Sequence, residues 1–110
     1  HYARPENRPD HSVVFMCFAA EEAGLLGSKH YTDKPLFPLT QIKFLINLDL
    51  LGTGGDGVMV VNGLRLEPEF ALLTRLNEEK KYLPKLQKRD NAPNSDHFFF
   101  TRRGVRACFF

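Results

Sequence analysis

The chain has 110 residues, of which 43% are hydrophobic and 25% are charged, and it contains no tryptophan. This composition excludes a disordered or fibrous protein, and the length predicts one domain with a single core. The 15 Lys and Arg residues nearly balance the 13 Asp and Glu residues, so nucleic acid is not the expected partner. Every apolar stretch is much shorter than the ~20 residues of a membrane-spanning helix, which predicts no membrane span.

The first half of the chain predicts a strand, a helix and a second strand. Residues 12–20 form a continuous run of apolar, β-branched and aromatic residues, which is typical of a strand buried on both faces. Residues 21–31 predict a tight turn into a helix, and residues 42–51 predict the second buried strand. Together these segments predict a right-handed βαβ unit.

The second half continues the alternation of strands and helices. Residues 58–63 predict a short strand, residues 67–80 an amphipathic helix, residues 85–90 an edge strand and residues 105–110 a final strand. Ser95 is expected to cap a short helix that runs through Phe100. The alternation predicts a fold of the α/β class.

The two cysteines, Cys17 and Cys108, each lie among apolar residues. A free cysteine in such surroundings behaves as a small hydrophobic residue, so we expect two buried thiols. A disulfide stays open as an alternative if the strands that carry them are neighbours.

Three carboxylates come after predicted strands. Glu21 and Glu22 directly follow the first strand, and Asp49 lies near the end of the second. Ligands of open α/β sheets bind beyond the carboxyl ends of the strands, so these side chains are expected to converge and to attract a metal ion. In the alternative, the two glutamates stabilise the first turn of a helix and Asp49 pairs with a Lys or Arg.

Three blocks of residues carry a resemblance to a known family. Residues 18–31, 46–52 and 95–98, with Gly104 and Val105, occur in the order found in the zinc-dependent M28 aminopeptidases, which the chain resembles. The resemblance implies a three-layer fold with an open, mostly parallel sheet and flanking helices. Because the chain begins without an initiator methionine and stops within an apolar run, we expect residues 1–110 to be a partial metallopeptidase catalytic domain, truncated at both ends.

The resemblance also implies roles for individual residues. Glu21 matches the general acid/base that takes a proton from the metal-bridging water, and Glu22 and Asp49 match ligands of the two zinc ions. The segment of Ser95, Asp96 and His97 lines the substrate side of the pocket in the family, and His97 is expected to be a pocket or core residue rather than a ligand.

The family's other three ligand residues have no counterpart in this sequence. Since a catalytic zinc site needs at least three protein ligands, we expect these 110 residues alone to bind zinc weakly or not at all and to be inactive. The resemblance implies that the full-length protein holds two zinc ions, acts on peptide substrates and is exported to the periplasm or the cell exterior.

Two alternative functions stay open. Residues 102–105, Arg-Arg-Gly-Val, resemble a stretch of the related glutaminyl cyclases, which are single-zinc aminoacyltransferases. A noncatalytic binding module with the same fold is the other alternative. In each case, self-association through truncated edges is expected, because apolar surface around Phe109 and Phe110 would be exposed.

Overall fold

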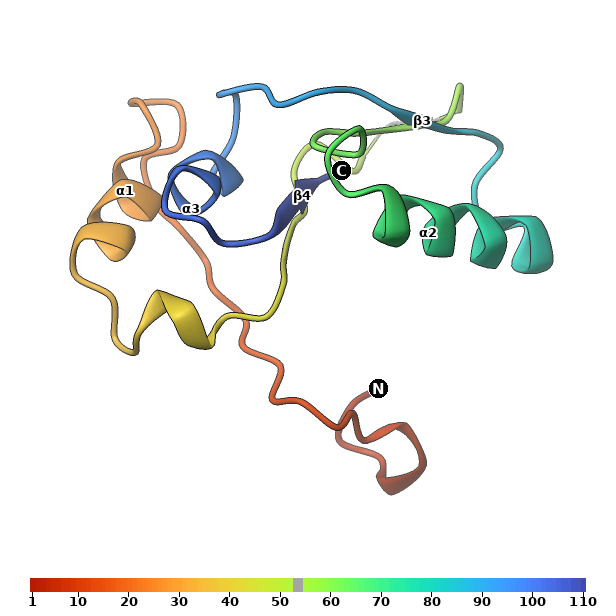
Figure 1. The fold of residues 1–110 in the computed structure, drawn as a ribbon, viewed down its shortest axis with the longest axis horizontal. Helices are drawn as coiled ribbons and strands as arrows, with labels where there is room; N and C mark the ends of the chain where they lie inside the picture. Colours follow the sequence, from red (N-terminus) through yellow and green to blue (C-terminus); the bar gives the residue numbers. More distant parts are fainter. Residues whose placement is uncertain (53–54) are drawn as a thin grey trace.

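A computed structural model describes residues 1–52 and 55–110 and has an α/β fold (Figure 1). The strands in this part of the chain are β1 (Leu45–Asn47), β2 (Val58–Val60), β3 (Leu86–Lys88) and β4 (Ala107–Phe109). The helices are α1 (Leu26–Asp33), α2 (Glu67–Lys80) and α3 (His97–Arg102), with short 3₁₀ turns η1 (Pro5–Asn7) and η2 (Leu39–Gln41). No helix within these residues is long and apolar enough to cross a membrane.

The strands form two small parallel sheets. Strand β1 pairs with β4, and β2 pairs with β3. An antiparallel bridge between Val61 and Phe109 joins the two sheets, and the Val61 N–H donates to the Phe109 carbonyl oxygen at 2.9 Å. The predicted parallel pairing is therefore confirmed.

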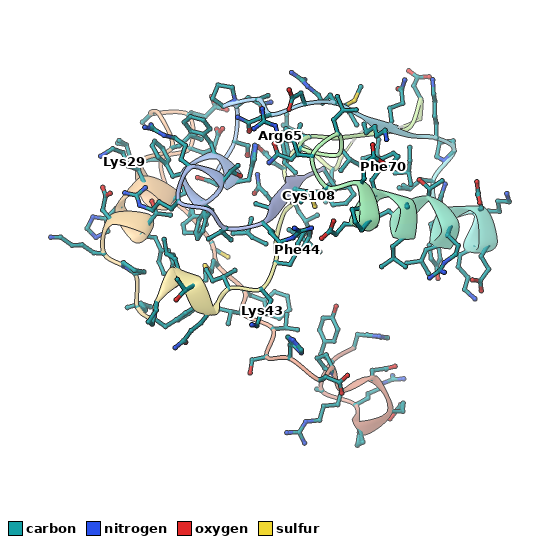
Figure 2. The ribbon with its side chains drawn as sticks, in the orientation of Figure 1. Lys29, Lys43, Phe44, Arg65, Phe70 and Cys108 are labelled. Atoms are coloured by element: carbon teal, nitrogen blue, oxygen red, sulfur yellow. The ribbon has the colours of Figure 1, made fainter. Side chains whose placement is uncertain are left out.

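The hydrophobic core lies where the two sheets meet. One cluster consists of Val60, Leu66 and Cys108, with Phe44 and Phe70 among the half-buried side chains packed against it (Figure 2). A second cluster consists of Val61, Ala92 and Phe109. All three residues of β4 are buried, as expected for a strand between two neighbours.

Helices α1 and α3 lie side by side next to this core (Figure 1). The fully buried ring of Phe100 stacks on Tyr31 of α1, with ring centroids 5.8 Å apart, and Phe18 lies 5.8 Å from the same ring. This aromatic contact holds residue 18, just before the two glutamates, against both helices.

The prediction of a buried strand over residues 12–20 is wrong for this structure. The segment has no partner strand among the described residues, and most of its apolar side chains are exposed, with Phe15 at 80%. A strand needs a neighbouring strand that pairs with its backbone N–H and C=O groups. Within the described part of the chain, only the carbonyl oxygens of Ala19 and Ala20 in this segment accept backbone hydrogen bonds, from N–H groups at the start of α1. The predicted βαβ unit is therefore not formed.

Two further expectations need correction. Cys108 is buried, but Cys17 is exposed because it lies in the unpaired segment, and both thiols are free. Phe109 is buried and Phe110 half-buried, so the expected apolar exposure is not there. It lies instead around residues 13–15 and 46–51, where Leu50 is 84% exposed.

The predicted helix over residues 67–80 is confirmed as α2 with the same bounds. Pro68 lies in its first turn, where a missing N–H costs no hydrogen bond. Its apolar face is only partly covered: Phe70 packs on the core cluster, whereas Leu72 and Leu76 are exposed.

Candidate active site

Glu21 and Glu22 lie in a tight turn that leads into α1. The Glu21 carbonyl oxygen accepts the N–H groups of Gly24 at 3.0 Å and Leu25 at 2.8 Å. Ala20 and Leu25, which flank the turn, both have left-handed backbone, with φ of 58° and 59°. Because α1 begins at Leu26 and has no acidic residue in its first turn, the two glutamates do not act as helix-stabilising charges.

Asp49 follows β1 and is held by neutral donors. The Ser95 hydroxyl donates to Asp49 Oδ2 at 2.9 Å, and the Asn47 side-chain amide donates to the Ser95 hydroxyl oxygen at 2.7 Å. Ser95 therefore does not cap α3 as expected, and Asp96 occupies the cap position without a side-chain capping bond. The Asp49 backbone N–H donates to the Phe110 carbonyl oxygen at 3.3 Å.

The carboxylates from these segments lie close enough to influence one another. Partial burial raises the pKa of Glu21 above its usual range. Three neighbouring negative charges raise this pKa further: Glu22, Asp49 and Asp96. None of these four carboxylates forms an ion pair with Lys or Arg in the described part of the chain, which contradicts the alternative pairing considered for Asp49.

Asp96 and His97 lie at the start of α3 and are partly or fully buried. One carboxylate oxygen of Asp96, Oδ1, is buried and has no hydrogen-bond partner among the described residues. The His97 ring is fully buried and stacks on Phe109 with centroids 5.4 Å apart. Burial lowers the pKa of His97 and so favours the neutral form of the ring.

A hollow of about 250 Å³ opens beside Asp49. Most of its lining is apolar, and the lining also includes the charged or polar side chains of Asp49, Arg89 and Asn94. The apolar side chains are Leu50, Leu51, Val58, Met59, Val61, Phe109 and Phe110. Such a mixture fits a small ligand that has an apolar group and a few polar atoms.

Sequence reasoning missed several residues of this site. Asn47 precedes Asp49 by two positions, and the alternation of a strand puts such residues on the same face, so its side chain could have been found from spacing. Arg89 carried no such signal. The family resemblance had placed Ser95 on the substrate side of the pocket, but its hydrogen bond to Asp49 joins segments that are distant in sequence, and the turn chemistry around Ser95 favoured a helix cap instead.

The charge of the described residues suits a cation, but these residues do not supply enough ligands for a zinc site. Four carboxylates without basic partners form a region of negative charge that a cation would neutralise. A catalytic zinc ion takes three protein ligands, and within residues 1–52 and 55–110 no three His, Cys, Asp or Glu side chains are grouped to hold a metal ion. Glu22 and Asp49 would therefore need further ligands.

Comparison with known proteins identifies a family and solved structures of similar fold. The model of peptidase family M28 matches residues 1–110. The chain is similar to BSAP, a zinc aminopeptidase from Bacillus subtilis, with 30% identity, a TM-score of 0.65 and coverage of 86% of this chain and 24% of that one. It shares the fold of LapA from Legionella pneumophila, with 23% identity, a TM-score of 0.58 and coverage of 84% and 27%. No curated protein matches the chain.

The chain corresponds to only part of each matched structure. The chain spans about a quarter of the length of each of the two solved structures. Its small parallel sheets and helices match the α/β fold of both.

Proposed function

Because the chain belongs to peptidase family M28, we propose that it forms part of the catalytic domain of a zinc-dependent aminopeptidase, which hydrolyses N-terminal peptide bonds. One observation carries the proposal: carboxylates from separate segments converge without basic partners around Glu21. The 30% identity to a zinc aminopeptidase over most of the chain supports it.

The proposed roles follow the chemistry of each side chain. Glu22 and Asp49 are metal ligands in a protein that supplies the remaining ligands for two zinc ions. Zinc, when bound, polarises the scissile carbonyl and acidifies water. Glu21 accepts the proton of the attacking water and returns it to the leaving amine.

The substrate side of the site is formed by other residues. The mostly apolar hollow beside Asp49 receives the first side chain of the peptide. Asp96, which has a buried carboxylate oxygen without a partner, helps to position the peptide, and His97 supports the wall of the pocket by its stacking on Phe109.

Peptide hydrolysis by the zinc-loaded protein that carries these residues tests the proposal. Mass spectrometry follows the release of the first residue from a panel of peptides with free amino termini. Glu21→Gln is expected to lower kcat by about 10²- to 10⁴-fold, the usual contribution of a general base. Glu6→Gln, an exposed glutamate in η1, is the matched control and is expected to retain full activity.

Three outcomes would contradict this function. Full activity of the Glu21→Gln variant would remove the proposed base. Loss of ammonia from peptides that begin with glutamine, without any hydrolysis, would indicate a glutaminyl cyclase. Release of no residue from any peptide, by a protein that retains zinc, would favour a noncatalytic binding module.

A zinc titration of the 110-residue chain by calorimetry tests the incomplete site separately. We expect weak binding or none, because the described residues lack a group of three ligands. Tight binding that is lost in both Glu22→Ala and Asp49→Ala would show that the chain completes its own site. That result would contradict the proposal that activity needs further ligands, and the aminopeptidase function would stand.

A further inference from the structure

A second hollow, of about 270 Å³, lies between α1 and α3 and shares no lining residue with the hollow beside Asp49. Four side chains line it: Lys29 from α1, Phe99 and Arg102 from α3, and Arg103 at the end of α3. Figure 2 shows Lys29 at the edge of the molecule next to these two helices. Three of the four lining residues are therefore cationic.

The charges in this hollow are only partly neutralised. Asp33 forms ion pairs with both Lys29 and Arg103, so one carboxylate is shared between two cations. Arg102 lies over the ring of Phe98 at 5.7 Å, a contact that leaves its full positive charge. The hollow and its ion pairs thus have an excess of two positive charges.

Helix stability explains only part of this arrangement. Arg102 and Arg103 at the end of α3 interact favourably with the negative end of the helix dipole. That effect does not require a lysine from another helix to face the same hollow, nor an aromatic ring in its wall. The ion pairs with Asp33 account for the positions of Lys29 and Arg103, but they do not require Arg102 and the ring of Phe99 to line the same hollow.

We propose that this hollow binds a small organic phosphate monoester with a planar apolar group. A phosphate monoester carries between about −1.5 and −2 charges at pH 7, which matches the excess of two positive charges, whereas a carboxylate supplies one. Guanidinium groups bind phosphate oxygens through paired hydrogen bonds, and Lys29 adds a third cation. Phe99 provides a surface for the apolar group. This inference is independent of the proposed peptidase function.

Phenyl phosphate is the probe that carries both features. Titration of the 110-residue chain, followed by backbone amide NMR shifts, is expected to move the signals of Lys29, Phe99, Arg102 and Arg103 most. Inorganic phosphate, which lacks the ring, and benzoate, which carries less charge, are expected to bind at least about fivefold more weakly.

Two variants with opposite expected effects test the charges. Arg102→Gln combined with Arg103→Gln is expected to weaken phenyl phosphate binding at least about tenfold, because charged hydrogen bonds are lost. Asp33→Asn is expected to tighten it, since Lys29 and Arg103 lose their competing partner. Arg75→Gln on α2, across the molecule in Figure 1, is the control for loss of a positive charge far from the hollow and is expected to bind within twofold of the parent chain.

Several results would overturn the proposal. One is an equal loss of phenyl phosphate affinity in Arg75→Gln and in the double variant. Another is a lower affinity in Asp33→Asn, and a third is a set of NMR shifts that centre elsewhere on the chain. Equal affinity for inorganic phosphate and phenyl phosphate would refute the role of Phe99. Circular dichroism of each variant establishes that it is folded, and Asp33→Asn keeps the test decisive if the double variant does not fold.

Discussion

Asp49 shows how a single carboxylate is prepared for a cation. Its hydrogen-bond partner, the Ser95 hydroxyl, satisfies one oxygen without neutralising the charge, and Asn47 in turn orients that hydroxyl. A lysine or arginine partner would have cancelled the charge. The same principle applies to Glu21, whose pKa is raised by partial burial and by the neighbouring carboxylates. A bound cation would relieve that repulsion.

The two thiols differ in exposure, which predicts a difference in reactivity. Burial raises the pKa of Cys108 to about 11, so at pH 8 only about one molecule in a thousand carries its thiolate. Cys17 is exposed in the unpaired segment. We expect iodoacetamide at pH 8 to add one group to the native chain, on Cys17, and a second only after unfolding, as measured by mass spectrometry.

Cys17→Ser is the control for this labelling and is expected to leave the native chain unmodified. Equal protection of Cys17 and Cys108 in the native chain would mean that residues 12–20 are covered in solution. Raising the pH toward 11 increases the thiolate fraction of Cys108. Its reaction is still expected to stay slow, because only 3% of the residue is exposed to the reagent.

At the scale of elements, the start of α1 depends on close contact with the preceding segment. The N–H groups of Leu26 and Gly27 donate to the carbonyl oxygens of Ala20 and Ala19 at 3.1 and 3.0 Å. These bonds satisfy donors that a helix start otherwise leaves unpaired. They also place Glu21, in the turn between the two segments, at a defined distance from the helix.

Gly27 is the residue that allows this approach, and its replacement tests the contact. A Cβ at Gly27 would lie 2.5 Å from the Ala19 carbonyl oxygen and 2.8 Å from the Ala19 nitrogen. Since both are backbone atoms, Gly27→Ala is expected to lower the free energy of unfolding by about 1–3 kcal/mol, measured by denaturant unfolding.

Gly52→Ala is the matched control, because a Cβ there meets no atom within 4 Å. Its expected effect is neutral or stabilising, by up to about 1 kcal/mol, through the reduced freedom of the unfolded chain. Equal stability of Gly27→Ala and the parent chain would show that α1 does not pack against Ala19 in solution.

At the scale of the whole molecule, the chain is more open than its length suggests. Its radius of gyration is 14.7 Å, compared with about 13 Å for a compact domain of this length. Two small core clusters support the fold, while a group of large apolar side chains stays exposed: Val13, Val14, Phe15, Ile46, Leu48, Leu50 and Leu51. Exposed apolar surface of this kind favours association.

We therefore expect the chain to self-associate in a concentration-dependent manner in sedimentation velocity experiments. Phe15→Lys is expected to weaken the association, because this ring is 80% exposed within the apolar segment. Tyr82→Lys removes a ring that is 77% exposed beyond the end of α2 and is expected to have little effect. A monomer at all concentrations, or equal effects of the two substitutions, would contradict this expectation.

The sequence alone determined the features that depend on local interactions. Residue pattern and motif order predicted the bounds of α2, the parallel α/β character, the final strand and the family. The spacing also singled out Glu21, Glu22 and Asp49 as candidate site residues. Asp49 follows strand β1 as expected, whereas Glu21 and Glu22 follow a segment that forms no strand.

The tertiary structure decided the features that depend on distant partners. Residues 12–20 have the composition of a strand, but a strand exists only where another backbone pairs with it. Ser95 could cap a helix or bind a carboxylate, and the approach of Asp49 across 46 residues selected the second. Both hollows likewise arise from segments far apart in the chain. Such contacts depend on how the elements pack together, which local sequence does not encode.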